Sequence, residues 1–570
     1  MGGRTVADFL QSDRPLTITT PLGTDALLVA GFRGREAVSE LFAFEFHLLA
    51  PVANPPVALD ELLGQIVTAG VNPVASLVGT PRKICGVVTS IRQANRDKEF
   101  THLYATVRPA WWYSTLRTNS RIFQQVTVVD ILKEVLAPFG PIETRLTTRY
   151  PLRDFTCQYQ ESDFAFATRL LEEEGIFYSF KHEEGKLTLI LADTLVNAPT
   201  ADVPMGLRYE PESGPSALGR EYRAWSWSKT QQVCATAVTT WDSTFELFRQ
   251  NLAADANLPA TATAGEVTHK LAPQAVGSVP IYLHDGDSAK RFDGIAPGGG
   301  DQASNLQGVY DDARRTARIR AEASAALAVR ITGEGNCPQL VPGTTVGFSG
   351  HYDADGTYFI AAVEHEAEFT GMYRSVDTVT ATYKNTFEAG PPDIIPRPTP
   401  KARRPRIGGP LTAVVTGPSN QEIFVDKYGR VKVQFLWDRQ GKFDANSSCW
   451  VRCSQLWAGK QWGAFFWPRI GMEVIVHFED GDPDRPLITG CVYNATNKPP
   501  SDLPGEAMIA GIKSCIFSGD PASQYNSIYF FDAPDYEYIL IHSESHTVSN
   551  AEVHKSEYVP GISFEFRGTI

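Results

Sequence analysis

Hydrophobic and polar residues alternate in short runs along most of the chain, a period-two pattern that is typical of half-buried β-strands. Residues 43–48 and 82–88 are the clearest examples in the first two thirds of the sequence. A hairpin is predicted where strands at 176–180 and 186–191 flank the turn Glu184-Gly185. The pattern therefore predicts a mainly β protein.

Three segments follow the helical period instead, which makes the predicted fold class multidomain α+β. The first helix is predicted to begin at Thr127, which can cap it together with Asp130, and to end at Pro138. Its apolar residues form one stripe: Val128, Ile131, Leu132, Val135 and Leu136. A second helix is predicted from Ser162 to Gly175, and an Ala- and Arg-rich third helix at 311–329.

A proline- and arginine-rich stretch marks the clearest domain boundary. Residues 396–406 hold five basic residues and four prolines, a composition that favours an extended, solvated backbone. We therefore predict a first block at 1–395, a linker at 396–415 and a second block from 416 onward. A nucleic-acid patch is the weaker interpretation of the same residues, because no aromatic side chain is interleaved.

Short strands in the second block suit a small Greek-key barrel of the OB type. They are predicted at 421–425, 430–435, 449–455, 472–478 and 487–492. Val431, Val433 and Phe435 alternate with Lys432 and Gln434, so we expect one face of that strand to be buried. Further short strands are predicted in the last part of the chain, at 512–518, 527–532 and 537–542.

Composition places the chain among globular proteins. Its 570 residues, 43% hydrophobic and 21% charged, allow about four domains and exclude bulk disorder. No apolar run approaches the ~18 residues of a membrane-spanning helix. Residues 1–5 lack the apolar core of a signal peptide, so Sec export is not expected.

The net charge of −13 argues against general binding to nucleic acid or to anionic membranes. Over half of this excess lies in residues 501–570, which carry ten acidic and three basic residues. The eight cysteines are scattered without a C-x-x-C pair. Cys449 and Cys453 would lie about 13 Å apart on one strand, too far for a disulfide. We expect buried free thiols and assembly in a reducing compartment.

No catalytic residue, metal ligand or cofactor site is predicted. His365-Glu366 begins like a zincin motif, but Phe369 stands where the second ligand belongs. Residues 353–356 resemble part of a calcium loop and better suit an Asp-Gly hairpin. The tail histidines His542, His546 and His554 are not at one compact ligand spacing. If three chains met on an axis, one histidine from each chain could bind a metal, but solvated strand histidines are the favoured interpretation.

A carboxylate cluster follows Phe478 in the second block. It comprises Glu479, Asp480, Asp482 and Asp484. Glycosidases place such carboxylates on opposed walls that raise one pKa and lower the other. These four share one loop, so we expect a solvated turn.

Half of the ten tryptophans fall between residues 437 and 467, which raises base stacking by the OB barrel as an alternative. Trp437 extends the core-facing alternation of the strand before it. The acidic loop would repel phosphate. Core or subunit packing is therefore the favoured interpretation of these tryptophans.

Several separated phrases of the first block resemble, in the same order, the hub region of VgrG, the spike protein family of type VI secretion systems. The phrases lie at 39–46, 104–112, 121–124, 159–166, 170–176, 340–343 and 355–358. The residues that carry this resemblance are Ser162, Asp163, Phe164, Gly175, Pro342 and Gly343.

The second block resembles the VgrG OB domain even more closely, at 426–433, 467–474 and 478–486. The matching residues are Asp426, Gly429, Trp467, Pro468, Gly471, Asp480, Gly481, Asp482 and Pro483. Residues 547–554 resemble the start of a VgrG spike repeat, and at most one repeat fits before Ile570. The spike is therefore expected to be short or truncated.

The resemblance implies a homotrimer with four parts in each chain. Residues 1–395 would form two barrel-like hub subdomains with α/β insertions, 396–415 the linker, 416–497 the OB barrel and 498–570 the start of a three-chain β-helix. Implied partners are an Hcp-type tube hexamer, a PAAR-type tip protein or effector, and baseplate proteins, with no nucleic acid.

The resemblance also implies a non-enzymatic protein that assembles in the bacterial cytoplasm and is expelled without a signal peptide. It would meet a membrane only by mechanical puncture. Alternatives are the spike of a contractile phage tail or extracellular injection particle and, in other classes, a cell-wall hydrolase or a single-stranded nucleic-acid-binding OB protein.

Overall fold

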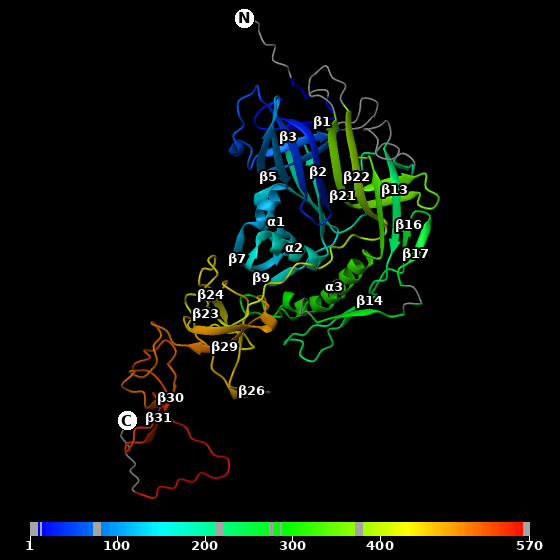
Figure 1. Cartoon of the computed structure of the whole chain (residues 1–570). Coiled ribbons are helices and arrows are strands. Elements are labelled where there is room, and N and C mark those ends of the chain that lie inside the picture. Colours follow the sequence, from blue (N-terminus) through cyan, green and yellow to red (C-terminus); the bar gives the residue numbers. More distant parts are fainter. Residues whose placement is uncertain are drawn as a thin grey trace.

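The computed structural model describes residues 9–561 except 12–13, 72–80, 204–205, 212–221, 273–274, 276, 285–287 and 371–379. The features noted above at residues 1–5 and in the last nine residues lie outside the described residues. The fold is mainly β, with the hub, the OB barrel and the tail following one another along the molecule (Figure 1).

The first hub unit is a curled sheet of six strands whose ends, β1 and β2, contact each other. Along the sheet the strands follow the order β1 (Leu16–Thr19), β4 (Ile66–Val71), β5 (Arg82–Arg96), β6 (Phe100–Arg108), β3 (Ala43–Pro51) and β2 (Leu28–Ala37). Phe44 and Phe46 on β3 are fully buried inside it, as the alternation predicts.

The second hub unit also has six strands. Their order is β21 (Gly356–Thr370), β20 (Thr345–Ser349), β12 (Leu207–Tyr209), β13 (Arg223–Gln231), β19 (Val329–Gly335) and β22 (Thr380–Gly390). Because β22 also pairs with β21, the sheet closes into a barrel. Antiparallel pairing of β2 with β21 joins the two units, and Gly34 on β2 is opposite His365.

A first insertion lies between the two units and contains two short helices, α1 (Val128–Leu136) and α2 (Asp163–Glu174). The predicted caps are confirmed: Thr127 accepts from the amide of Asp130, Ser162 accepts from that of Ala165, and Gly175 adopts φ +67°. The insertion's strands are β7 (Thr118–Thr127), β8 (Ile142–Arg145), β9 (Leu152–Ser162), β10 (Phe177–Glu183) and β11 (Lys186–Ala192). The predicted hairpin is the β10–β11 pair.

A second insertion follows β13 and consists of two small sheets and a long helix. The strands are β14 (Ala237–Thr240), β15 (Ala254–Asn257), β16 (Thr261–Ala264), β17 (Val267–Lys270) and β18 (Pro280–Leu283). The third helix, α3 (Gln307–Ala325), starts four residues earlier than predicted and ends four residues earlier. Its N-terminus has no side-chain cap to mark it, and Val329 opens strand β19 instead.

Short 3-10 turns occur beside these elements. They are η1 (Leu59–Glu61), η2 (Ala110–Thr115), η3 (Ala137–Phe139), η4 (Ala289–Arg291), η5 (Ala303–Leu306) and η6 (Glu479–Gly481).

The OB barrel is a five-stranded sheet that a bridge between Val431 and Val451 closes. Its order is β24 (Lys432–Phe435), β23 (Leu411–Thr416), β28 (Glu473–Phe478), β29 (Pro486–Val492) and β25 (Arg452–Cys453). The strand predicted at 421–425 is wrong, because β23 takes that place in the sheet and begins inside the range predicted as linker. A side hairpin, β26 (Trp457–Gly459) with β27 (Trp462–Ala464), leaves the barrel.

Lys432 and Gln434 are buried too, so both faces of β24 are covered. The Gln434 side-chain amide donates to the carbonyl oxygens of Phe435, the last residue of β24, and of Asp438 on the loop that follows. The Lys432 ammonium lies 5.2 Å from the centre of the Trp450 ring. The alternation therefore identified the apolar face correctly, but it could not show that polar side chains find partners on the other face.

The tail contains a three-stranded antiparallel ribbon: β30 (Ile509–Lys513), β31 (Ser527–Phe531) and β32 (Tyr538–His542). Residues 547–554 form no strand in the single chain. The tail extends away from the hub in Figure 1. All eight cysteines are free, as expected, but Cys491 is exposed and Cys449 and Cys453 are only half-buried.

Candidate functional site: the charged hub–OB junction

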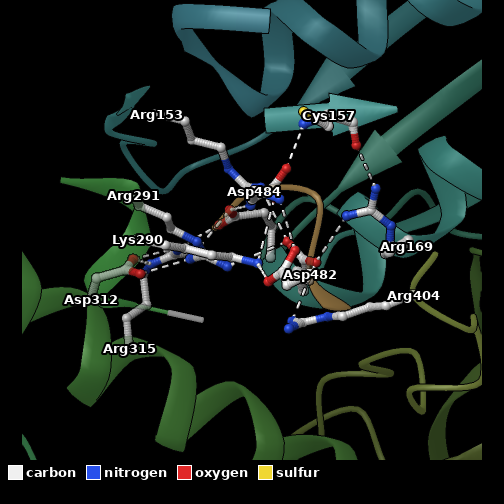
Figure 2. A network of polar contacts seen from close by, with 12 residues as sticks. Arg153, Cys157, Arg169, Lys290, Arg291, Asp312, Arg315, Arg404, Asp482 and Asp484 are labelled. Atoms are coloured by element: carbon white, nitrogen blue, oxygen red, sulfur yellow. Dashed lines mark hydrogen bonds and ion pairs between the residues drawn. The ribbon is translucent and has the colours of Figure 1, made fainter. Parts of the chain in front are cut away.

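Charged side chains from the hub and from the OB barrel meet in one buried cluster, which we call the junction (Figure 2). The hub contributes β9, the C-terminal end of α2, η4 and α3, and the OB barrel contributes the loop after β28. Local sequence fixes each element, since Ser162 and Gly175 delimit α2 and Gly481 adopts the positive φ of +74° that the loop requires.

Lys290 is the connection between the two domains. Its ammonium lies 2.8 Å from a carboxylate oxygen of Asp482 and 3.5 Å from one of Asp484, and its side chain is only 5% exposed. Asp484 also accepts a hydrogen bond of 2.6 Å from the amide of Cys157 on β9. The acidic loop is thus not the solvated turn that we expected, because Lys290, far away in sequence, covers Asp482 and Asp484. Of the four acids only Asp480 is exposed, since Glu479 is half-buried and pairs with arginines.

The two carboxyl groups respond differently to this environment. Burial acts to raise the pKa of Asp482, but the charge and hydrogen bond of Lys290 outweigh it and hold that pKa below its usual value. Burial raises the pKa of Asp484, and Lys290 offsets this only in part. The pKa of Lys290 is raised, because the two carboxylates outweigh its burial. The buried ammonium of the hub and the carboxyl groups of the OB loop therefore compensate one another across the domain boundary.

Consecutive glutamates at the end of α2 form the second half of the junction. Glu173 and Glu174 are buried, although a helix C-terminus disfavours negative charge. Burial opposes their ionisation, but surrounding arginines hold the pKa of Glu173 well below its usual range and that of Glu174 at about 2. The cations that contact them are Arg153, Arg169, Arg291, Arg315 and Arg404.

The predicted linker is bound to the hub rather than solvated. The backbone amides of Lys401 and Ala402 both donate to Glu172 at 2.9 Å. Arg397 is buried and donates to the carbonyl oxygens of Gly175 and Asp193. At its other end, the amide of Ile407 donates to the carbonyl of Gly481. Two of the basic residues that suggested solvation, Arg397 and Arg404, therefore attach the segment through their side chains.

A second set of contacts holds the OB turn after residue 425 to the hub. The Arg430 guanidinium donates to both carboxylate oxygens of Asp293, at 2.7 and 2.9 Å, and to Asp426 at 2.6 Å. Trp450 donates from its indole nitrogen to the carbonyl oxygen of Ala296. Bidentate pairing fixes direction as well as distance, so the OB barrel is held in one orientation on the hub.

The residues that carry the family resemblance fall into four groups. Ser162, Asp163, Gly175, Gly481, Asp482 and Pro483 belong to the elements of the junction, and Asp480 adjoins it on the exposed side. Asp426 belongs to the second set of contacts, through its pair with Arg430. Trp467, Pro468, Gly471 and Gly429 lie on the OB barrel, where a Cβ at Gly429 would collide with the Trp467 ring. Phe164 packs on the hub core, and Gly343 packs on Ser179, beside Pro342.

The charged groups of the junction suit a structural role, because they are paired with one another. Its carboxylates are matched by cations, and within the residues that the structure describes no group of three or more His, Cys, Asp or Glu could hold a metal ion. The zincin-like His365 is buried and contacts Glu36 at 3.1 Å and the Tyr383 hydroxyl at 2.6 Å. In the described part of the chain, the helices are too short or too polar to cross a membrane.

Family comparisons fit this architecture. Residues 35–370 match the phage tail baseplate hub family, and residues 413–493 match the type VI secretion system/phage-baseplate injector OB domain. The spike protein VgrG1b of Pseudomonas aeruginosa is 32% identical over 557 residues, which cover 95% of this chain and 69% of the relative. The chain belongs to the VgrG family. It is also 33% identical to VgrG1a of that organism, over 94% of this chain and 78% of the relative.

A solved structure shows a similar fold at lower identity. The Escherichia coli c3393 protein, a type VI secretion component similar to the phage T4 tail proteins gp27 and gp5, superposes with a TM-score of 0.55 at 19% identity. The match covers 84% of this chain and all of that chain. VgrG is thus a family of structural spike and hub proteins, built from a β-rich hub and an OB domain.

Sequence reasoning missed the hub side of the junction. Lys290, Arg291, Asp312 and Arg315 were not singled out, because nothing local distinguishes them from solvated charges. One signal was available: Glu172-Glu-Glu174 stands directly before the glycine that ends α2. Three acids at the negative end of a helix require nearby cations, and that requirement pointed to a buried charge cluster.

Proposed function

We propose that the chain forms the homotrimeric spike hub of a type VI secretion machine. In this role it joins an Hcp-type tube hexamer to the puncturing needle and carries a PAAR-type tip protein or effector. VgrG membership supports the machine, and the tail supports the trimer. The observation that carries the proposal is an apolar face that the single chain leaves open.

That open face belongs to β31 and β32. Their register pairs Ile528 with Ile541 and Phe530 with Ile539, so all four side chains lie on one face. Their exposed fractions are 45%, 68%, 44% and 64% respectively. A three-stranded ribbon that leaves its apolar face in water is marginal alone. Three copies that wind together would bury these faces and cover the strand edges.

The hub architecture supports the contact with a hexameric ring. Each chain contains two six-stranded units joined by the β2–β21 pairing. A trimer would therefore present six similar units around its axis, the number that a hexamer of Hcp type requires. Baseplate proteins would contact the outside of the same hub.

The proposed role needs no catalysis and no nucleic acid. We propose the domain limits 1–395 for the hub, 396–410 for the linker, 411–497 for the OB barrel, whose strand β23 begins at Leu411, and 498–570 for the tail. The junction would transmit force between the hub and the OB barrel. The chain would assemble in the cytoplasm, leave with the machine without a signal peptide, and meet a membrane only by puncture.

Size-exclusion chromatography with light scattering tests the trimer at micromolar concentration. A mass three times that of one chain is expected, and a well-folded monomer would contradict the proposal. Co-purification with an Hcp hexamer then tests the tube contact. A cell-wall turnover assay and an oligonucleotide-binding assay at low salt should both remain negative.

A further inference from the structure

One exposed apolar segment of the OB barrel is not explained by the junction or by the tail. Residues 456–467, which we call the tryptophan hairpin, include β26, β27 and the chain on either side. Five large apolar side chains of this segment are more than half exposed: Leu456 89%, Trp457 65%, Trp462 57%, Phe465 68% and Phe466 54%. The label of β26 marks the position of the hairpin below the barrel in Figure 1.

The hairpin is held in a fixed shape. Trp457 and Trp462 meet edge to face with ring centres 4.8 Å apart. A Cβ at Gly459 would collide with the Trp462 ring, and one at Gly463 would collide with the carbonyl oxygen of Trp457. At the base, Gln455 exchanges two hydrogen bonds with the backbone of Phe466, at 2.9 and 3.3 Å. These aromatic rings are therefore positioned outward before any partner binds.

The exposed area has the size of an interface. Aromatic side chains bury ~150–250 Å² each, so five large side chains that are more than half exposed present roughly 700 Å² of apolar surface. The largest apolar patch on a monomeric protein is typically about 300–600 Å². A standard interface buries about 800 Å² on each partner.

The location of the hairpin indicates what covers it. Arg469, two residues after its end, donates to the carbonyl oxygen of Cys515 at 2.7 Å. Arg469 also pairs with Glu422, which accepts from the amide of Ser518 at 2.7 Å. The base of the hairpin is thus attached to the start of the tail. Any neighbour that completes the tail strands lies close to the hairpin as well.

The charge of the hairpin disfavours a polyanion as its partner. Lys460 is the only charged residue between 456 and 467, whereas single-stranded nucleic acid is held by a basic groove along with stacked rings. We propose that the tryptophan hairpin packs against a neighbouring copy of the chain and forms the OB-level contact of the assembly. This inference rests on the proposed trimer and adds to it a specific contact outside the tail.

Photo-crosslinking of the full chain tests the contact. p-Benzoylphenylalanine in place of Trp462 should give bands at two and three times the mass of one chain on denaturing gels. The crosslinking yield should not change when the protein is diluted tenfold, as long as its concentration stays above that at which trimers dissociate. The matched control carries the same probe in a chain with Ile539→Asp and Ile541→Asp. If these changes separate the copies, the crosslink should disappear.

A second variant measures how much the contact contributes. Trp457→Ser with Trp462→Ser should keep the circular dichroism spectrum and raise the concentration at which trimers dissociate by at least tenfold. Tyr352→Ser, which removes an 87% exposed ring from the hub, should change it less than twofold.

The outcomes separate the two proposals. Trimers that form without a crosslink from position 462 would overturn the hairpin contact and leave the spike function standing. A wild-type monomer would overturn both. Quenching of the hairpin tryptophans by a single-stranded oligonucleotide at low salt would assign the surface to base stacking and would also overturn the contact.

Discussion

The junction and the tail obey opposite rules of burial. At the junction, charged residues such as Lys290 and Glu174 lie inside and are paired within one chain. In the tail, apolar residues such as Ile539 and Ile541 lie outside without a cover. The difference separates what one chain completes by itself from what the proposed trimer would complete.

The junction is better explained by orientation than by stability. Burying an ion pair costs desolvation energy that its attraction often only just offsets. An apolar interface of the same size would stabilise the two domains as well, but it would not fix their relative orientation. The bidentate pair between Arg430 and Asp293 and the fork of Lys290 onto two carboxylates permit one docking angle. The proposed spike would transmit force along its axis, which requires a fixed angle between the two domains.

Placing charged residues on the apolar face of the tail should give the largest effect and tests directly whether this face is buried between chains. Ile539→Asp with Ile541→Asp places two charges on the face that we expect to be buried between copies. The assembly should fall from three chains to one in light scattering, while the hub and OB transitions in calorimetry stay within 1 °C. Val196→Asp, at an 84% exposed hub position, is the control and should leave the trimer intact. A trimer that survives the double change would contradict the assignment.

Removing the cation at the centre of the junction should give the next largest effect. Lys290→Met leaves Asp482 and Asp484 buried without their ammonium. Breaking a buried pair from one side costs about 3–5 kcal/mol. We expect the hub–OB unit to melt earlier and the segment 398–406 to become sensitive to protease.

A matched control exists for the Lys290 change, because Lys427 pairs with Asp301 across the same two domains at an exposed position. Lys427→Met should leave both readouts unchanged, since exposed pairs are screened by solvent. Equal losses of melting temperature and protease resistance in the two variants would show that burial does not determine how much an ion pair stabilises the junction.

Two glycines in separate turns of the OB barrel allow a finer comparison. Gly429 and Gly471 both have positive φ, +72° and +89°, but only a Cβ at Gly429 meets the Trp467 ring. Gly471→Ala should cost about 1–2 kcal/mol from backbone strain alone. Gly429→Ala should cost about 1–3 kcal/mol more, because the ring must move. Calorimetry of the OB transition measures both, and equal losses would show that the Trp467 contact is dispensable.

Features that depend on neighbouring residues could be predicted from the sequence. The caps at Thr127 and Ser162, the stop at Gly175 and the β10–β11 hairpin depend on a few consecutive residues, and all of them are confirmed. Family membership and the fold class followed from ordered motifs and are confirmed as well.

Features that depend on distant partners could not be predicted. Asp482 appeared solvated because its partner Lys290 lies 192 residues away. Lys432 appeared exposed because Trp450 approaches it only in the folded barrel. Strand β23 was overlooked because it directly follows a basic, proline-rich stretch that favours open chain. In each case the local pattern was sound, and long-range burial decided the outcome.

A pH titration gives the smallest expected effect and tests the edge of the junction. Asp154 on β9 accepts a hydrogen bond from Gln125 at 2.8 Å and faces Asp293, Arg430 and Lys432. Burial, and then the charge of Asp293, raise the pKa of Asp154 to about 7, from an ordinary value of 3.8. The folded chain therefore keeps a proton that the unfolded chain releases.

Between about pH 4 and pH 7 the folded state binds the extra proton, so its stability falls as the pH rises through this range and levels off above it. Because Asp154 is only partly enclosed, we expect a loss of about 1–2 kcal/mol across the window. Asp154→Asn should remove that slope and make the chain more stable than wild type at pH 8. Lys432 and Arg430 are present in both proteins, so their own contributions to the pH dependence cancel when the two stability curves are subtracted. Asp480→Asn, at the exposed position of the junction loop, should reproduce the wild-type slope. A difference curve between wild type and Asp154→Asn that is flat from pH 4 to pH 8 would place Asp154 with the solvated charges and draw the border of the junction at Asp484.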